Sequence, residues 1–585
     1  MYDLSKVVEC FPFGVFREGQ REVIVFAANA FNDGKRYVII EGPTGAGKSA
    51  IATCLANMVQ YSYYLTITKI LQDQLVREFG DTIVELKGRA SYPCTYWPLH
   101  GQSLVNKGVI SQKALANNLA ASHSCGDGFC VSDAKDEEKR GRKCLKCFLG
   151  NDWRFAQSLP SGMKFSSCPY YEQVEQALIA RKVVMNFHAF LYQTQMSHRF
   201  DIMRDLLIVD ECHNCESILM DFIAISIDDK LLQQYGKSLP EFDEAAEYAL
   251  WFEDNDIGKL LVEAYSDLND KLIGAVSSDV KEKLGIIRAM DDIGRLGRRY
   301  KLFMESIAKN NGTEWIAESD QVEFAKSKYN RVTLKPVMVG DFAQTHLLRY
   351  GKNVLLMSAT ILDVNTFCRS IGVSPTDVAS YRMRNRFPAR SRPIYYQPVA
   401  KITGGAAGQL VWGPSLVAGV EDRVRAYPMQ RGIIHTHNFA IADMLYEQCA
   451  KDVRDRFSYQ KNFLDKAALL DYHTFNEKSV LIAPALSEGI DLIGELSRFA
   501  IICKTPYPNF YDNKQMIRRM ELDEMYYTWL TALKLVQSYG RSVRSDTDYA
   551  DTYIIDSAFA YFYHKAKRIL PGWFKEAICW NSESR

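Results

Sequence analysis

A glycine-rich segment near the start of the chain has residues of the kind that hold a triphosphate. It fits the pattern G-x-x-x-x-G-K-[ST] and reads Gly42-Pro43-Thr44-Gly45-Ala46-Gly47-Lys48-Ser49. Glycines let backbone N–H groups curl around phosphate oxygens, and the helix predicted directly afterwards adds its positive dipole end. Lys48 is predicted to reach the β- and γ-phosphates, and Ser49 to bind Mg²⁺. The candidate nucleotide contacts in this segment are Gly42, Thr44, Gly45, Gly47, Lys48 and Ser49.

Two consecutive acids follow an apolar run at 206–209, in the string Asp210-Glu211-Cys212-His213. Carboxylates that end a buried strand are costly unless they meet a cation or hydrogen-bond donors. Asp210 is therefore predicted to hold Mg²⁺ through water, and Glu211 to orient and deprotonate the attacking water. Alone this string is a weak signal, but together with the upstream phosphate loop it indicates ATP hydrolysis.

Two arginines near the end of the chain have the spacing of one helix face. Residues 537–544 read QSYGRSVR, and Arg541 and Arg544 are three positions apart. Arg541 and Arg544 could therefore both act as arginine fingers on a γ-phosphate bound by another domain. Gln537 is a further candidate catalytic residue. The alternative is an exposed basic helix face, which a lone G-R-x-x-R string would favour.

Cysteines are concentrated in one part of the chain. Six of the 14 fall within a window of 75 residues, and these are Cys94, Cys125, Cys130, Cys144, Cys147 and Cys168. In a chain without a secretion signal, such clustering is more typical of metal ligands than of disulfides. The spacing of Cys144 and Cys147 lets both sulfurs face one site, which suits an iron–sulfur cluster. The alternatives are a tetrahedral zinc site of Cys125, Cys130, Cys144 and Cys147, or no metal.

Short apolar runs alternate with helical patterns on either side of these motifs. The predicted strands lie at 37–41, 64–68, 206–209, 354–357, 432–435, 480–483, 500–504 and 552–556. This alternation predicts parallel sheets with helices on both faces. Two stretches interrupt it: the cysteine-containing residues ~90–170, and residues ~223–334, whose apolar spacing predicts helices.

Composition limits the classes of partner. The chain has 585 residues and a net charge of +1, so it is not uniformly basic and must grip any polyanion through local patches. One candidate patch for single-stranded DNA is Arg382, Arg384, Arg386, Arg390 and Arg392. The alternative is a linker whose arginines form internal ion pairs. No apolar run approaches the ~20 residues of a membrane helix, and the N-terminus has no signal pattern, so we expect a cytoplasmic protein without a membrane segment.

The ordered set of motifs resembles a known family. The motifs together are similar to those of a superfamily 2 helicase, and most similar to those of the XPD/DinG-like iron–sulfur DNA helicases. They are GPTGAGKS, DECH, Ser358-Ala359-Thr360, SEGID at 487–491 and QSYGRSVR. The segment Phe11-Pro12-Phe13 with Arg17 and Gln20 is similar to that family's adenine-side motif. The resemblance runs from ~11 to ~556. Cys212 departs from it, because the family usually has alanine there.

The resemblance implies an α/β fold of two RecA-like parallel-sheet motor domains, with an Fe–S cluster insert and a helical arch insert in the first. The implied first motor domain comprises 1–90, 171–222 and 335–380, the cluster domain 91–170, the arch 223–334, and the second motor domain 381–585. It further implies that Arg17, Gln20, Gly489 and Asp491 contact ATP. The implied ligands of a 4Fe–4S cluster are Cys94, Cys144, Cys147 and Cys168, with Cys125 and Cys130 surplus or replacing one of the pair.

The activity that the resemblance implies is ATP-dependent translocation along single-stranded DNA, 5′ to 3′, with unwinding of duplex DNA. The expected partners are single-stranded and forked DNA, and the expected state is a monomer. The alternative function is a DNA-stimulated ATPase that remodels nucleoprotein without processive unwinding, because such a protein would carry the same motifs.

Overall fold

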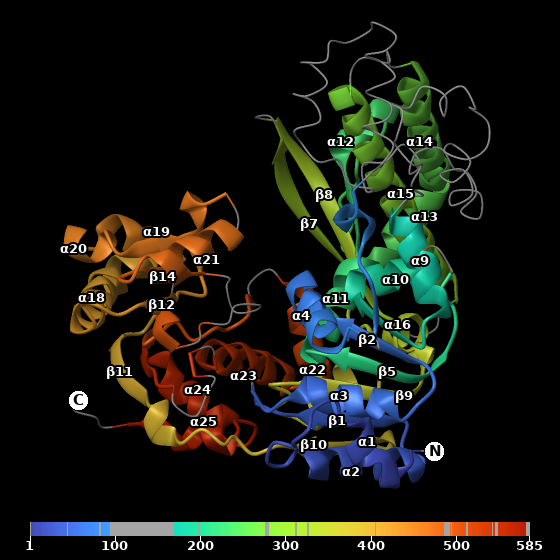
Figure 1. Cartoon of the computed structure of the whole chain (residues 1–585). Helices are drawn as coiled ribbons and strands as arrows, with labels where there is room; N and C mark the ends of the chain where they lie inside the picture. Colours follow the sequence, from blue (N-terminus) through green and yellow to red (C-terminus); the bar gives the residue numbers. More distant parts are fainter. Residues whose placement is uncertain are drawn as a thin grey trace, which may run out of the picture.

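Two seven-stranded parallel sheets form the two lobes of the computed structural model (Figure 1). The structure describes residues 2–43, 45–80, 83–93, 169–195, 199–274, 280–309, 313–324, 327–403, 405–464, 466–484, 492, 494–510, 513–540, 542–543 and 548–580. No helix among these combines the length and the apolar character that crossing a membrane requires.

The first sheet places the phosphate loop and the two acids at the same edge. Its strand order is β10-β1-β9-β5-β2-β4-β3, and all neighbours pair in parallel. In that order the strands are β10 (Val378–Arg382), β1 (Tyr37–Glu41), β9 (Gly351–Ser358), β5 (Arg204–Asp210), β2 (Ser62–Thr66), β4 (Lys182–Asn186) and β3 (Val84–Leu86). Because parallel strands share one carboxyl edge, the loops after β1, β5 and β9 meet there.

Helices cover both faces of this sheet because successive strand residues are apolar on both sides. Ile40 packs in one cluster with Ile51 of α3, whereas Ile39 packs in another with Leu219 of α11. The helices on the Ile40 face are α2 (Gln20–Asn32), α3 (Lys48–Asn57) and α4 (Lys69–Phe79). Those on the Ile39 face are α9 (Pro169–Ile179), α10 (Phe187–Gln195), α11 (Cys215–Ile223), α16 (Gly340–His346) and α17 (Val364–Ser370).

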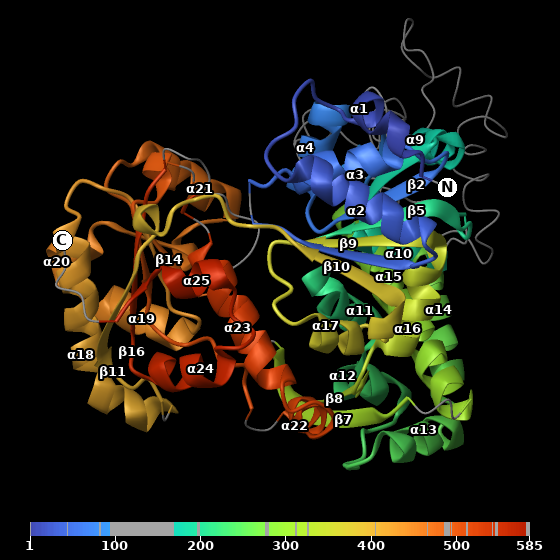
Figure 2. The same cartoon turned by 90° about the horizontal axis from the view of Figure 1, so that it is seen from below.

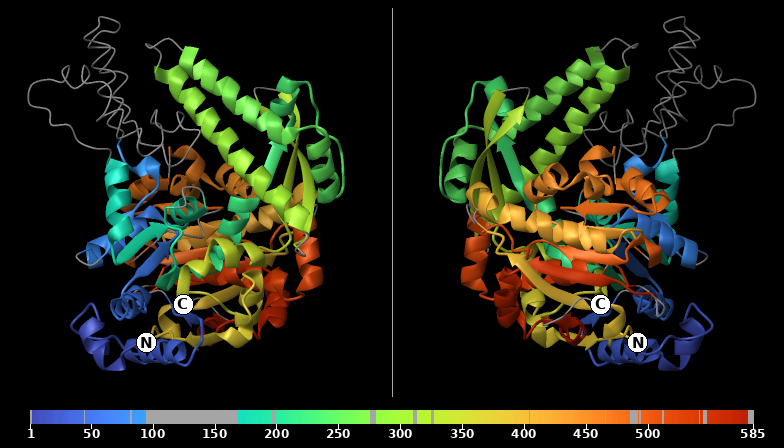
Figure 3. Two further views of the ribbon diagram at one scale, coloured as in Figure 1. Left: turned by 90° about the vertical axis from the view of Figure 1, so that its right-hand side faces the viewer. Right: turned by 90° about the vertical axis from the view of Figure 1, so that its left-hand side faces the viewer.

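A segment of the first lobe projects away from its sheet (Figure 3). It contains α13 (Ala245–Asp254), α14 (Ile257–Gly274) and α15 (Val280–Lys309). It also contains an antiparallel sheet of β6 (Ile225–Asp228), β8 (Ser327–Pro336) and β7 (Trp315–Phe324). The expectation of helices alone is therefore wrong for this segment. Trp315 and Ala317 of β7 are buried two residues apart, and this period of two marks a strand.

The second sheet has the order β13-β14-β12-β15-β16-β11-β17 and is also parallel. In that order the strands are β13 (Phe457–Tyr459), β14 (Val480–Ala483), β12 (Gly432–His435), β15 (Phe499–Ile502), β16 (Asp551–Asp556), β11 (Ile394–Ala400) and β17 (Ile578–Cys579). Its main helices are α18 (Gly405–Ala426), α19 (Phe439–Gln448), α21 (Lys466–Phe475), α24 (Ala558–Ala566) and α25 (Gly572–Glu576). The prediction of two parallel α/β domains is confirmed.

Two helices that follow β15 connect the lobes. They are α22 (Lys514–Leu522) and α23 (Tyr526–Tyr539), and α22 lies beside β7 of the first lobe (Figure 2). Trp529 is buried, and its Nε1 donates to the Ile361 carbonyl oxygen at 2.8 Å. Arg519 Nη2 pairs with Glu216 Oε1 at 2.8 Å, and both side chains are buried.

Candidate active site

The phosphate loop joins β1 to α3, as the sequence predicts. Gly45 and Gly47 have φ of +82° and +75°, in the left-handed region that glycine adopts without strain. A Cβ atom at Gly47 would lie 2.2 Å from Gln20 Nε2, so a side chain there would clash. Both the turn and the close approach therefore require glycine.

The two residues of the expected adenine-side motif hold this loop in shape. Arg17 Nη1 donates to the Gly45 carbonyl oxygen at 2.9 Å. Gln20 Nε2 donates to the carbonyl oxygens of Ala46 and Gly47 at 3.3 and 3.2 Å. Gln20 Oε1 accepts from the Arg17 backbone N–H at 2.8 Å, which fixes the amide. The motif thus lies against the phosphate loop.

Lys48 and Asp210 lie on neighbouring elements at the carboxyl edge. Lys48 is buried, and its Nζ donates to the Gly42 carbonyl oxygen at 3.0 Å. Asp210 ends β5 and is also buried. The pKa of Asp210 is raised to about 6, chiefly by burial and also by the Glu211 carboxylate, against the opposing effect of the Lys48 ammonium. A cation beside Asp210 would stabilise the charged form of this buried carboxylate.

Ser49 and Asp210 form a donor set that fits Mg²⁺. The Tyr64 hydroxyl interacts with both side chains, and its distance to Asp210 Oδ2 is 3.5 Å, so the two predicted ligands face the same small volume. A hydroxyl and one carboxylate, completed by water and phosphate oxygens, are the ligands that Mg²⁺ takes in nucleotide sites. The residues present therefore fit the predicted ion.

Glu211 lies in a compact polar cluster with His213 and Ser358. Its backbone is left-handed, with φ of +50°, and such strain is often found at functional sites. Glu211 Oε2 is 3.4 Å from His213 Nδ1 and accepts from Ser358 Oγ at 3.4 Å. His213 Nδ1 is 2.7 Å from Ser358 Oγ. The Ser-Ala-Thr string at the end of β9 is thus joined to the acids after β5.

The second lobe contributes Gln537 to this cluster. Gln537 Nε2 lies 2.5 Å from His213 Nε2 and donates to Thr360 Oγ1 at 3.3 Å. Asn214 Nδ2 is 2.8 Å from the same His213 nitrogen. Both amide nitrogens lie within hydrogen-bond distance of Nε2, which accepts through its one lone pair when Nδ1 carries the proton. A chain of hydrogen bonds therefore crosses from one lobe to the other.

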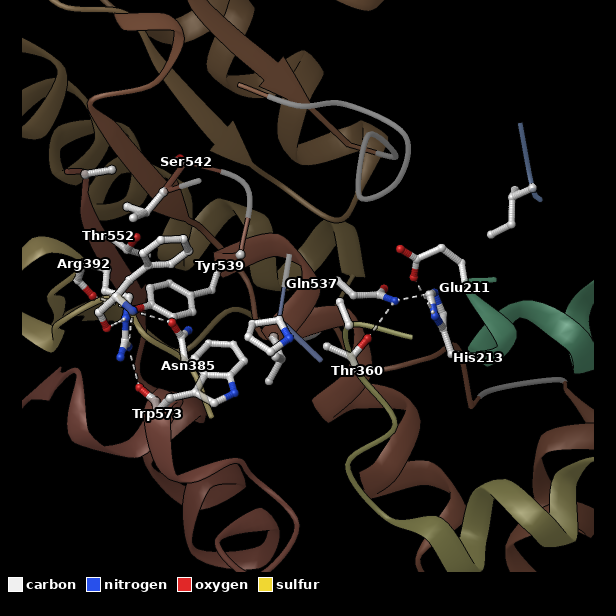
Figure 4. Close-up of a pocket in the computed structure, with 18 of the residues that line it drawn as sticks. Glu211, His213, Thr360, Asn385, Arg392, Gln537, Tyr539, Ser542, Thr552 and Trp573 are labelled. Carbon is white, nitrogen blue, oxygen red and sulfur yellow. Dashed lines mark hydrogen bonds and ion pairs between the residues drawn. The ribbon is translucent and has the colours of Figure 1, made fainter. Parts of the chain in front are cut away.

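A cavity of about 350 Å³ opens between the lobes at this point (Figure 4). Pro43 of the phosphate loop, Glu211 and Thr360 line it from the first lobe. Gln537 and Gly540 line it from the second lobe. Of the predicted residues, Glu211 and Gln537 line this cavity, and Lys48 and Asp210 lie next to Glu211 in the first lobe. In the chain, 324 positions separate His213 from Gln537.

Several predicted site residues lie outside the described part of the chain. They are Thr44, Gly489, Asp491, Arg541 and Arg544, together with the cluster candidates Cys94, Cys144, Cys147 and Cys168. Among the described residues, no group of three or more His, Cys, Asp and Glu side chains is placed to hold a metal ion. The roles of these nine residues stay predictions.

The arginine-rich segment combines internal ion pairs with exposed side chains. Arg382 Nε pairs with the buried Glu41 Oε2 at 2.5 Å. Arg392 is buried and pairs through Nη2 with Glu576 Oε1 at 2.6 Å. Arg382 and Arg392 therefore fit the alternative prediction of internal ion pairs, because each guanidinium binds a carboxylate of the protein. Arg384 and Arg390 are exposed.

Some residues at the cavity carry no recognisable sequence signal. Asn385 and Trp573 line it, but neither lies in a motif or in a periodic apolar run. They are near one another only because the linker after β10 and helix α25 pack together. His213, in contrast, is part of the D-E-C-H string. The sequence could therefore have indicated it as a site residue, the one that Gln537 contacts.

Two domain models match the chain, and both belong to helicases. DEAD_2 matches residues 110–232, and the helicase C-terminal domain matches residues 423–577. Together with the fold and the interlobe site, these matches indicate a two-lobed P-loop protein similar to helicases.

Curated relatives and solved structures are consistent with this class. The ATP-dependent DNA helicase CHL1 of Candida albicans is 30% identical over 115 residues, which are 17% of this chain and 13% of that protein. CHL1 of Debaryomyces hansenii is 20% identical over 499 residues, 71% of this chain and 60% of that protein. The chain therefore spans less than two thirds of these relatives.

Solved structures named "XPD_Helicase" and "Structure of S. tokodaii Xpd4" share the fold. Their TM-scores are 0.57 and 0.52 at 14% and 13% identity. The alignments cover 95% and 97% of this chain and 99% and 100% of those chains. The two sheets thus share the fold of these structures, and the predicted resemblance to the XPD/DinG-like helicases is confirmed.

Proposed function

We propose that the chain hydrolyses ATP and uses the movement of its two motor domains to translocate along single-stranded DNA, 5′ to 3′, and to unwind duplex DNA. The observation that carries this proposal is the contact of Gln537 in one lobe with His213 in the other, beside Glu211. A bound triphosphate at this point would be touched by both lobes, so its cleavage would change how strongly they attract each other.

Each residue of the site has a proposed task. Lys48 leaves the Gly42 carbonyl and binds the β- and γ-phosphates. Glu211 orients the attacking water and accepts its proton, while His213 holds the carboxylate in place. Mg²⁺, held by Ser49 and Asp210, would neutralise developing phosphate charge. Arg541 and Arg544 are the proposed arginine fingers.

The remaining nucleotide and cluster contacts are proposed from the sequence. Arg17 and Gln20, which hold the phosphate loop in its shape, would also contact ATP, as would Thr44, Gly489 and Asp491. A 4Fe–4S cluster on Cys94, Cys144, Cys147 and Cys168 is the proposed fold-stabilising element of residues 91–170. Iron and acid-labile sulfide in a coloured protein, as isolated, support the cluster, whereas zinc in a colourless protein contradicts it.

The proposed substrates are single-stranded and forked DNA. Exposed arginines such as Arg384 and Arg390 would contact phosphates, and binding should weaken as salt is raised because counterions are released. We propose a monomer that acts in the cytoplasm, with the projecting segment at 223–334 as the helical arch. The domain boundaries expected from the sequence belong to the same proposal.

Strand displacement on tailed duplexes of both polarities tests this function. We expect ATP-dependent displacement from a 5′ tail and DNA-stimulated ATP hydrolysis, both lost in Lys48→Ala. If hydrolysis is stimulated by DNA but no strand is displaced, the protein is instead an ATPase that remodels nucleoprotein.

A further inference from the structure

The antiparallel sheet of the projecting segment has an edge that is covered at one end and open at the other. β7 and β8 form a long hairpin (Figure 1), and the strand order β6-β8-β7 leaves β7 at the edge. An isolated bridge between Glu244 and Ile316 covers the start of β7. At Glu318 the edge meets α22, because the Gln515 backbone N–H donates to Glu318 Oε1 at 3.4 Å. Beyond Glu318, no strand within the described ranges pairs with this edge.

The hydrogen bonds of the hairpin show which backbone groups of β7 point outward. The Val337 N–H donates to the Glu314 carbonyl oxygen at 2.8 Å, and the register continues from this pair without a shift. Hydrogen-bonded pairs recur at every second residue of an antiparallel ladder. The N–H and carbonyl groups of Ser319, Gln321 and Glu323 therefore point away from β8. β7 has neither a lysine nor a proline, two residues that commonly block an open edge.

A cavity of about 530 Å³ lies beside the open part of β7. Loop 239–243 forms one wall, and residues 319–321 of β7 and 330–332 of β8 form another. The bridge at Glu244 is antiparallel, so the residues that precede Glu244 start out along β7 toward Ser319. No further pair forms within the described residues, and the cavity lies between this loop and the strand. It therefore occupies the place where a fourth strand would continue.

The charges around this cavity favour a basic ligand. Asp320 accepts from Arg331 Nε at 2.8 Å, and Asp243 pairs with Lys514 of α22 at 3.1 Å. Glu241, the third acid of the lining, forms no ion pair with a residue that the structure describes. The lining thus carries one more negative than positive charge, which repels a polyanion such as nucleic acid and attracts a cation.

We propose that the open edge of β7 binds an extended, basic peptide segment of another protein. The segment would add as a fourth strand beside residues 319–323 and place a lysine or arginine side chain at Glu241. Main-chain hydrogen bonds give affinity in this kind of strand addition, and pockets for side chains give specificity. The surface lies outside the nucleotide site, so this inference is independent of the proposed function.

Selection from a display library of random peptides, about eight residues long, with the full chain as the target, tests the proposal. We expect the selected peptides to be rich in lysine and arginine. Synthetic copies, labelled for fluorescence anisotropy, should bind with dissociation constants of about 1–100 μM. If the library yields no peptide whose binding depends on the β7 edge, the proposal is overturned.

A proline at the edge tests the main-chain contact. Gln321→Pro removes the outward N–H and should weaken peptide binding about tenfold or more, because edge positions tolerate proline but lose the donor. The matched control is Gln321→Ala, which removes only the side chain and should bind the peptides as the wild-type protein does. The thermal midpoints of both variants report whether the hairpin remains folded. Equal peptide affinities of the two variants would contradict strand addition.

A charge reversal tests the cavity without altering the backbone. Glu241→Lys should weaken binding of the basic peptides about tenfold or more, whereas Glu447→Lys, an exposed glutamate on α19, should leave it unchanged. No effect of Glu241→Lys would overturn the proposed contact. Competition by a single-stranded DNA oligonucleotide would assign the surface to nucleic acid, and a dimer that Gln321→Pro abolishes would assign it to a second copy of the chain. Either result overturns the proposal.

Discussion

The contacts of Gln537 and of Arg519 both join the second lobe to the first, but they differ in character. Gln537 reaches His213 at the edge of a cavity of about 350 Å³. Arg519 instead pairs with Glu216 inside the packed core, and its Cζ lies 3.9 Å from the centroid of the Tyr526 ring. The first contact is next to empty space, whereas the second is enclosed by side chains.

This difference indicates how the lobes move. Hydrogen bonds beside a cavity exchange with water or with a ligand at small net cost, typically about 1 kcal/mol each. A buried ion pair is different, because separating it leaves an uncompensated charge in the core. We therefore expect the Gln537 contact to open and close during ATP turnover, while the Arg519 contact and Trp529 act as the pivot.

The largest expected effect is at the cavity side. Lys48→Ala should lower ATP turnover by about 10³-fold or more, since a positioned cation on the transferring phosphoryl group is lost. Folding and single-strand binding should be retained. Lys352→Ala, an exposed lysine on β9, serves as the control in the same assay. Loss of folding in Lys48→Ala would show that this lysine has a structural role.

The next effect is at the pivot. Arg519→Met should lower the free energy of unfolding by about 3–5 kcal/mol, because the Glu216 carboxylate is left buried without its partner. Denaturant unfolding measures it. The matched control is Arg518→Met, whose pair with Glu314 (2.7 Å) is exposed, so its loss should change the free energy of unfolding much less. Equal losses in the two variants would remove the distinction between a pivot and an ordinary surface contact.

A combined variant sharpens the same point. If the cost comes from an unpaired charge, Arg519→Met together with Glu216→Gln should be more stable than Arg519→Met alone. Purely additive losses would mean that the two side chains stabilise the core independently of each other.

Gln537→Ala should have a smaller effect, of about tenfold on kcat, because one hydrogen bond to His213 is lost while Glu211 and Lys48 remain. The free energy of unfolding should stay within about 0.5 kcal/mol of the wild-type value. Steady-state ATP hydrolysis and denaturant unfolding of the same preparation separate the two readouts. A large loss of stability would place Gln537 with the pivot.

The smallest expected effect concerns pH. Burial, reinforced by Lys534 and Lys504, lowers the pKa of His437 to about 4, and His437 Nε2 lies 3.3 Å from Ser538 Oγ beside the cavity. Since the unfolded chain binds this proton more readily, stability should fall as pH decreases from about 6.5 toward 4.

Glu216 at the pivot should respond in the opposite direction. Burial raises the pKa of Glu216, so the folded state binds its proton more readily than the unfolded chain does.

His437→Asn tests the histidine effect. Asparagine tolerates the positive φ of 51° at that position, and the variant should lose less stability in acid than the wild-type protein does. Unfolding measured at pH 7 and pH 5 checks this; an unchanged pH dependence in His437→Asn would contradict it.

Much of the candidate site is visible in local sequence. The order of glycines before Lys48 and the acids after an apolar strand both depend on near neighbours in the chain, and the structure places them at one edge of one sheet. The arginine run was less informative, because a guanidinium binds a phosphate or a carboxylate equally well. Only packing showed that Arg392 is buried and bound to Glu576.

By itself, the sequence determined the eight strands predicted above, the phosphate loop and the acids, because hydrophobic period and turn chemistry act over a few residues. Only the tertiary structure decided that Gln537 meets His213, that Asn385 faces the same cavity, and that Arg519 is buried against Glu216. These contacts join segments more than 150 positions apart. They exist because two sheets pack through α22 and α23, and no local pattern encodes which faces will meet.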